Sequence, residues 1–291
     1  DDDDDTPTRT YYDLNGVAYG NNTFVAVGDD GTVFTSSDYG ATWDNGTRGT
    51  EKDLYEIAYG NSTFVAVGKR GTHSFSSDNG TSWSVGTWSG TDDITGVAYG
   101  NVFLADNTSV STFIGVSSSN LTLSTDNGSN WGQVCSGMKI YDIAFGNSIF
   151  VGSGAEGAIG IVTDNGTNCS LGNSGTQTNT LYGTTYGNNR FFSVGSSGKL
   201  IISDDNGSSF GDITSPVTKH IYSVVFGNDT FVAVGYKTVI VSNNVGGSAT
   251  ETENTITFND VTFGNGVFVA VGDDEIIYTS TDGDTWTKVY P

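Results

Sequence analysis

The amino-acid sequence predicts an all-β protein: a single seven-bladed β-propeller of four-stranded antiparallel blades. One observation is a phrase close to Tyr-Gly-Asn-x-Thr-Phe-Val-Ala-Val-Gly, which recurs seven times in 291 residues. The aromatic residues that open the copies lie 37 to 46 residues apart: Tyr19, Tyr59, Tyr99, Phe145, Tyr186, Phe226 and Phe263. A second observation is that Gly- and Asn-rich turns separate the short strand-forming runs. A period of this length, built from short strands and tight turns, is typical of propeller blades.

The first copy contains four predicted strands, which we name A to D. Strand A is predicted over residues 14–19, strand B over 24–27 and strand C over 32–36, and strand D begins at Thr42. Gly and Asn residues lie between strands A and B, and Gly and Asp residues lie between strands B and C. These residue types favour tight turns, so a tight turn is predicted at each connection. The apolar run 24–27 does not alternate with polar residues, which is typical of a strand covered on both faces by neighbouring sheets.

The order of the strands assigns each connection to one face of the disc. The A-to-B and C-to-D turns lie on one face, and the B-to-C and D-to-A connections lie on the other, which we call the top face. Extra residues between Asn101 and Phe113 in blade three fit either a long A-to-B turn or a long B-to-C connection. Residues 286–290 supply a D strand to blade seven. The propeller is therefore predicted over residues 14–291, after an acidic tail and a surplus strand in residues 1–13.

Charge excludes two classes of partner. The net charge is −22 and the isoelectric point is about 4.1. Nucleic acid and anionic membranes are dense in negative charge and would repel this surface. No apolar run reaches the roughly 18 residues that a membrane-spanning helix needs. Because the chain starts at Asp1 instead of Met, we expect a processed, extracellular or cell-surface protein.

The C-to-D turn of blade one reads Ser36-Ser37-Asp38-Tyr39-Gly40-Ala41-Thr42-Trp43, and blades two and three keep the same key residues. On this motif the chain resembles the Asp-box (BNR-like) β-propellers, which include sialidases, sortilin-type receptors, glycoside hydrolases and photosystem assembly factors. The resemblance implies a structural turn, in which Asp accepts backbone N–H bonds, Gly takes the strained position and the aromatic packs between blades. A motif repeated in most blades does not mark one catalytic site.

The two cysteines of the chain have two possible states. Cys169 stands where the box of blade four would place Trp, and Cys135 lies near the end of blade three. An even pair is compatible with one disulfide in an oxidising compartment, and two buried free thiols are the alternative. Our hypothesis is a Cys135–Cys169 disulfide that substitutes for the lost aromatic packing.

Two sets of top-face residues are candidate binding sites. Four tyrosines at the start of A strands would form a stacking platform for a sugar or peptide, or pack around the channel mouth: Tyr55, Tyr141, Tyr182 and Tyr222. Two doubled aspartates lie in the B-to-C turns of blades one and seven, which ring closure makes neighbours: Asp29, Asp30, Asp273 and Asp274. These four carboxylates would suit Ca²⁺, and ordinary turn acids are the alternative. No other cofactor is expected.

The inventory of charged residues argues against an enzyme. Four arginines are present, and only Arg48 and Arg70 would face a top-face ligand, so a sialidase-like arginine triad is missing. A glycosidase needs two carboxylates about 5 to 9.5 Å apart. Three acids at equivalent A-strand positions are candidates: Glu56, Asp142 and Asp260. We expect them to be solvated acids at the channel mouth.

Eleven Asn-x-Ser/Thr sequons are candidate N-glycosylation sites: Asn21, Asn45, Asn61, Asn79, Asn107, Asn120, Asn127, Asn165, Asn168, Asn206 and Asn228. Seven of them recur at A-to-B or C-to-D turns. Glycans there would coat that face and leave the top face or the rim for partners.

The surplus segment before blade one suggests self-assembly. Thr8, Arg9, Thr10, Tyr11 and Tyr12 have strand-forming composition. They would pair with blade seven of the same ring, or with a blade edge of a neighbouring subunit, which generates a filament if the contact does not close. The sequence favours a non-enzymatic extracellular scaffold or adhesion propeller. A carbohydrate- or peptide-binding propeller is the alternative, with a cell-surface glycan or protein as partner, and a glycosidase is the weaker one.

Overall fold

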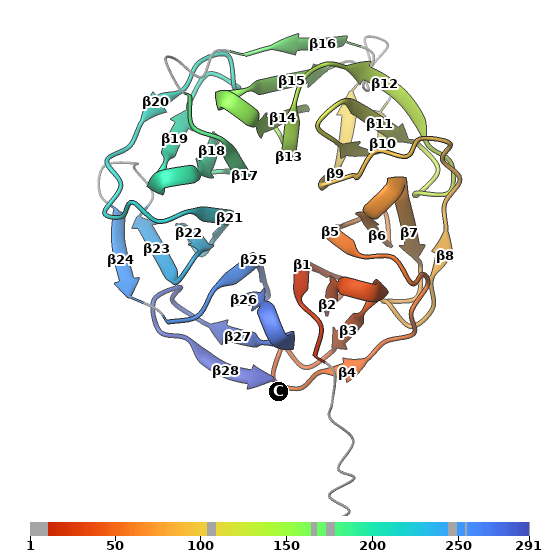
Figure 1. The fold of residues 1–291 in the computed structure, drawn as a ribbon, viewed down its shortest axis with the longest axis horizontal. Coiled ribbons are helices and arrows are strands. Elements are labelled where there is room, and N and C mark those ends of the chain that lie inside the picture. Colours follow the sequence, from red (N-terminus) through yellow and green to blue (C-terminus); the bar gives the residue numbers. More distant parts are fainter. Residues whose placement is uncertain are drawn as a thin grey trace, which may run out of the picture.

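Seven four-stranded antiparallel sheets form a closed ring (Figure 1), which confirms the predicted fold class. The computed structural model describes residues 11–103, 109–163, 168–172, 178–243, 249–253 and 255–290. Within each sheet the strands follow chain order, from the A strand nearest the ring axis to the D strand on the rim (Figure 1). Among the described residues, no helix is long and apolar enough to cross a membrane.

The strands occupy equivalent places in the seven blades. The A strands are β1 (Leu14–Gly20), β5 (Leu54–Gly60), β9 (Gly96–Phe103), β13 (Ile140–Gly146), β17 (Leu181–Gly187), β21 (Ile221–Gly227) and β25 (Phe258–Gly264). The B strands are β2 (Thr23–Gly28), β6 (Thr63–Gly68), β10 (Ser109–Val116), β14 (Ile149–Gly154), β18 (Arg190–Gly195), β22 (Thr230–Gly235) and β26 (Val267–Gly272). The C strands are β3 (Val33–Ser36), β7 (Thr72–Ser76), β11 (Asn120–Ser124), β15 (Ile159–Thr163), β19 (Leu200–Ser203), β23 (Thr238–Asn243) and β27 (Ile277–Ser280). The D strands are β4 (Asp44–Asn45), β8 (Ser84–Val85), β12 (Gly132–Ser136), β16 (Asn168–Leu171), β20 (Gly211–Asp212), β24 (Ala249–Glu253) and β28 (Thr287–Tyr290). Single 3-10 turns follow five of the B strands: η1 (Asp29–Gly31), η2 (Lys69–Gly71), η3 (Ala155–Gly157), η5 (Ser196–Gly198) and η6 (Asp273–Glu275).

The C-to-D turn delays the fourth strand of blade one, which begins at Asp44 and not at Thr42. Asp38 Oδ1 accepts a hydrogen bond from the Thr42 amide (2.9 Å), and the Gly40 amide donates to Ser36 Oγ (2.9 Å). Gly40 has φ +83°, a conformation that glycine adopts at little cost. Thr42 therefore belongs to the turn.

The open register of blade three is resolved in favour of the A-to-B hairpin. Strands β9 and β10 pair from Gly96 with Val116 out to Phe103 with Ser109, so the extra residues lengthen both strands at their A-to-B end. The sequence left this choice open because the segment mixes strand-forming residues with Asn, Asp and Ser and so does not mark a single turn.

A glycine and an aromatic residue from successive blades make the same contact around the whole ring. Six A strands end in glycine, and β9 has Gly100 at the equivalent position. The marker aromatic of the next blade lies against each of these glycines, so that a Cβ built on Gly20 would overlap the Tyr59 ring. The remaining pairs are Gly60 with Tyr99, Gly100 with Phe145, Gly146 with Tyr186, Gly187 with Phe226, Gly227 with Phe263 and Gly264 with Tyr19. The aromatic-Gly pair in each copy of the repeated phrase therefore takes part in packing between blades as well as in a turn within its own blade.

Blade seven is complete without a strand from the N-terminus, because β28 pairs with β27. The ring closes through side chains and loops instead. The Glu275 amide donates to the Tyr12 carbonyl (2.9 Å), and the Asp274 amide donates to Asp13 Oδ1 (3.0 Å). The Arg48 guanidinium lies 5.0 Å from the centroid of the Tyr12 ring. Tyr12 therefore contacts its own ring, while Thr8, Arg9 and Thr10 lie outside the described residues.

Candidate ligand-binding site at the top of the ring axis

The second residue of six A strands, and Thr95 just before β9, occupy equivalent positions at the top-face end of the A strands: Asn15, Tyr55, Thr95, Tyr141, Tyr182, Tyr222 and Asn259. Blades six, seven, one and two are neighbours in the closed ring. At this point they enclose a hollow of about 490 Å³ that is lined by Asn15, Tyr55, Tyr222, Tyr236, Thr257, Asn259 and Asp273. Its volume and its mixture of aromatic and polar residues make this open hollow the candidate ligand site.

Two of the four predicted tyrosines line this hollow, and two do not. Tyr55 and Tyr222 line it, and Tyr182 packs edge-to-face on Tyr222 with 5.9 Å between ring centroids. Tyr141 is absent from the lining. Burial raises the pKa of the Tyr55 and Tyr222 phenols above their usual value, so both remain hydrogen-bond donors at neutral pH.

Sequence reasoning missed Tyr236, which lies in the B-to-C connection of blade six and is 47% exposed. Its signal was available, since this connection lies on the top face and an aromatic is unusual in a turn.

Asparagine amides connect neighbouring blades on two sides of the hollow. Asn15 Nδ2 donates to the Leu54 carbonyl of blade two (3.0 Å) and to Asp29 Oδ1 (2.9 Å). Asn259 Nδ2 makes the corresponding bonds, to the Leu14 carbonyl and to Asp273 Oδ1, each at 3.0 Å. Hydrogen bonds therefore preorganise the rim of the hollow at two places: between blades seven and one, where the ring closes, and between blades one and two.

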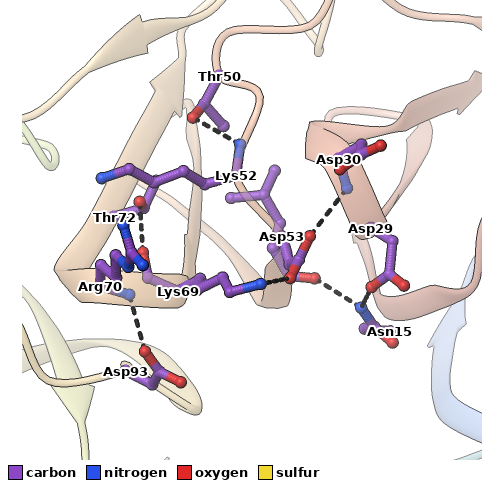
Figure 2. A network of polar contacts seen from close by, with 11 residues as sticks. Asn15, Asp29, Asp30, Thr50, Lys52, Asp53, Lys69, Arg70, Thr72 and Asp93 are labelled. Carbon is purple, nitrogen blue, oxygen red and sulfur yellow. Dashed lines mark hydrogen bonds and ion pairs between the residues drawn. The ribbon is translucent and has the colours of Figure 1, made fainter.

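The doubled aspartates belong to a repeated contact between blades, part of which Figure 2 shows. The Asp30 amide donates to Asp53 Oδ1 of the next blade (3.1 Å), and the Arg70 amide donates likewise to Asp93 Oδ1 (2.8 Å). Lys69 Nζ lies 2.6 Å from Asp53 Oδ2. Asp30 and Asp274 contribute amides while Asp29 and Asp273 bind asparagines, and the described residues contain no group of three or more His, Cys, Asp or Glu arranged for a metal ion.

Three acids lie at equivalent positions of their A strands, and the expectation that they are solvated is wrong for Asp260, which is buried, while Glu56 and Asp142 are half-buried. Asp260 is 6% exposed, and its carboxylate accepts bonds from the Val17 amide (2.8 Å) and Ser223 Oγ (2.5 Å). Asp142 accepts the amides of Ile143 (2.7 Å) and Thr184 (2.6 Å). Glu56 Oε1 accepts the amide of Ile57 (2.7 Å).

Small residues beside the acids explain their burial. The residues at the level of the acids read Gly16, Glu56, Gly96, Asp142, Gly183, Ser223 and Asp260 around the ring, so each acid lies between two small residues of the neighbouring blades. A Cβ on Gly16 would lie 2.9 Å from Glu56 Cα, and a Cβ on Gly96 would lie 2.8 Å from Asp142 Cα. The A strands are too close at this level for side chains in adjacent blades, and the same closeness covers the acids. This alternation is visible in the sequence and is the signal that we missed.

Burial raises the pKa of Asp142 to about 7 and that of Asp260 to about 6, and it raises the pKa of Glu56 well above its usual value. The folded protein therefore binds these protons more tightly than the unfolded chain, in which carboxyl pKa values are about 4. Stability from these groups is complete below about pH 4 and falls as the pH rises through 6 and 7.

We expect the free energy of unfolding to decrease by about 2 to 4 kcal/mol between pH 5 and pH 8. Urea denaturation across this range measures it. The double variant Asp142→Asn, Asp260→Asn is the control for the general repulsion of a protein with net charge −22, and its stability should depend less steeply on pH. Equal slopes for the variant and the wild type would contradict this assignment.

The chain was compared with known proteins in three ways. No family model matches it, and no curated protein matches it. Among solved structures, a structure titled "YCF48 bound to D1 peptide" superimposes with a TM-score of 0.70 and 15% identity, covering 93% of this chain and 92% of that one. YCF48 from Cyanidioschyzon merolae gives a TM-score of 0.69 and 14% identity, covering 93% and 96%. The computationally designed protein Ika8 gives 0.66 and 12%, covering 97% of each chain. At these identities the likeness establishes the propeller fold alone.

Several sequon asparagines hydrogen bond to one another on the face opposite the hollow. Asn21 Nδ2 donates to Asn79 Oδ1 of the next blade (2.9 Å), and Asn61 Nδ2 donates to Asn127 Oδ1 (2.8 Å). Asn206 accepts the same bond from Asn147, which is outside any sequon (2.8 Å). Glycans on the donors would therefore share Nδ2 with a contact between blades.

The remaining sequons lie in varied surroundings. Asn228 is in an A-to-B turn, Asn45 and Asn168 are in outer strands, and Asn120 Nδ2 donates to Asp92 Oδ2 (2.8 Å). Asn107 and Asn165 lie outside the described residues. Use of any sequon remains a prediction.

Proposed function

We propose that this chain is a non-enzymatic binding propeller that holds an extended polypeptide over the hollow at the top of the ring axis. The observation that carries the proposal is the convergence of Tyr55, Tyr222 and Tyr236 on one hollow whose rim is fixed by hydrogen bonds. Protonated phenols donate to peptide carbonyls while their rings cover apolar surface. The solved structure of YCF48 with D1 peptide supports the proposal by analogy of fold.

The ligand that fits this hollow carries a basic side chain. Asp273 is the acidic residue of the lining, and Asp29 lies nearby on the same face. A cationic side chain would be attracted to this group of carboxylates, whereas an anionic peptide would be repelled.

One further feature supports a non-enzymatic role. The axial acids use carboxylate oxygens as acceptors for backbone amides of their own or the next blade, which is a structural task. We also propose that the chain is a divergent Asp-box propeller, supported by the bonds that Asp38 accepts within its turn.

Peptides selected from a phage-displayed 12-residue library test the proposal. We expect enrichment of sequences with Lys or Arg next to aromatic residues, and at least a tenfold weaker Kd for the variant Tyr55→Ala, Tyr222→Ala, since each aromatic contact contributes about 0.5 to 1.5 kcal/mol beyond its buried area. Tyr39→Ala, which alters an exposed tyrosine on the opposite face, is the matched control. Selected peptides that bind the double variant as tightly as the wild type would refute the site.

Extracellular assembly through the N-terminal segment is a second proposal. Tyr11, the first described residue, is 46% exposed, and the outer strands β24 and β28 are longer than β4, β8 and β20. A long outer strand offers unpaired backbone groups to another chain. The oligomeric state of a chain that lacks residues 1–12 tests this proposal.

A further inference from the structure

The junction between blades seven and one contains a second hollow, on the face opposite the tyrosine site. Its volume is about 580 Å³. Blade one contributes Asp38 and Tyr39 of its C-to-D turn, and blade seven contributes its own C-to-D turn, with Asp282, and the outer strand β28, with Thr287 and Val289. We call this junction the seam, because the first and last blades of the chain meet here and neither contributes a strand to the other.

One residue distinguishes this junction from three others. At three other junctions, an asparagine in the A-to-B turn of one blade donates to an asparagine in the C-to-D turn of the next blade. The acceptors are Asn79 for blade one, Asn127 for blade two and Asn206 for blade four. In blade one, Tyr39 stands at this position, opposite Asn265 of blade seven. The seam therefore has an aromatic ring where those junctions have a hydrogen bond.

Tyr39 occupies this position at a conformational cost. Its φ is +64°, close to the +60° of Asn79 and Asn127, and its side chain is 52% exposed. Asparagine tolerates positive φ, whereas a bulky residue there is strained. A strained residue that also gives up a bond between blades points to a function at that position.

The walls of the hollow determine which ligand chemistry fits. Asp38 and Asp282 both lie there, and hydrogen bonds lower the pKa of each, so both are charged and an anionic ligand would be repelled. The lining side chains also include the hydroxyls of Thr279, Thr281 and Thr287. Apolar surface comes from Val267 and Val289 and from the exposed ring of Tyr39.

A peptide is the poorer occupant of this hollow. Thr287 and Val289 are alternate residues of β28, so blade seven presents the side chains of one sheet face, which offers no main-chain ladder to an added strand. A neutral sugar fits both the apolar and the polar surfaces of the hollow. Its C–H face stacks on an aromatic ring, and its hydroxyls bond to threonines and carboxylates.

We infer that the seam hollow binds a neutral oligosaccharide, with Tyr39 as the stacking residue and the blade-seven threonines as hydrogen-bond partners. This site is separate from the proposed polypeptide site, because its residues come from the C-to-D turns and outer strands and not from the B-to-C turns.

Calorimetric titration with four hexasaccharides tests the inference: those of β-1,4-glucose, β-1,3-glucose, β-1,4-mannose and β-1,4-N-acetylglucosamine. We expect at least one to bind. Tyr39→Asn should weaken its binding at least tenfold and should also raise Tm, because it relieves strain and allows a bond with Asn265. Thr287→Val, which keeps the shape and removes the hydroxyl, should weaken binding several-fold.

A gain in Tm separates loss of the stacking ring from loss of the fold, so weak binding by Tyr39→Asn is not explained by unfolding. Tyr55→Ala is the control at the other face and should leave sugar binding unchanged. Absence of binding by all four sugars at millimolar concentration would overturn the inference, as would wild-type affinity in both Tyr39→Asn and Thr287→Val.

Discussion

Replacing Gly146 by alanine should lower the free energy of unfolding by about 3 kcal/mol, although it adds a single methyl group. The new Cβ would overlap the ring of Tyr186 in the next blade. That ring cannot retreat, since it packs on Phe191 with 4.8 Å between centroids, and Phe191 is fully buried. Urea denaturation measures the effect, and a thermal melt should show Tm lower by at least about 5 °C.

Gly132→Ala provides the matched control, because Gly132 is also a strand glycine and a Cβ there would contact nothing within 4 Å. Its stability should stay within about 0.5 kcal/mol of the wild type. If Gly146→Ala were as stable as Gly132→Ala, the glycine–aromatic contact would not be a determinant of blade packing.

The repeated phrase made the blade count and the strand order predictable, because each copy carries its own turn residues and apolar runs. The same phrase concealed the glycine–aromatic contact, since Tyr19 and Gly20 are neighbours in sequence but each packs against a different adjacent blade. Contacts between equivalent positions in successive repeats are set by the ring, and a sequence read one copy at a time does not display them.

The candidate site was predictable in part for the same reason. The tyrosines were found by their place in the A strands, yet which of them share a hollow depends on ring closure, which brings Tyr55 and Tyr222 to one opening. The axial acids were found by position, but their burial follows from the spacing between A strands. Gly16 and Gly96, which flank Glu56 in the ring, were the sequence signal for that spacing.

Loss of the cross-link between blades three and four is the second large effect that we expect. The structure joins Cys135 of β12 to Cys169 of β16 by a disulfide, with 6.5 Å between Cα atoms and a sequence separation of 34. The bond ties the outer strands of adjacent blades at the one box where a cysteine replaces the aromatic. In blades one and three that aromatic is a buried tryptophan, Trp43 or Trp131.

The double variant Cys135→Ser, Cys169→Ser should lose about 3 to 4 kcal/mol of unfolding free energy, because a loop of this length is no longer closed in the unfolded chain. Dithiothreitol should lower the stability of the wild type by a similar amount and leave the variant unchanged, which separates the cross-link from the packing of two serines. Alkylation of the wild type without reductant tests the bond itself. Two modified thiols in the folded protein would contradict it, and the outer strands of blades three and four would then be held by packing alone.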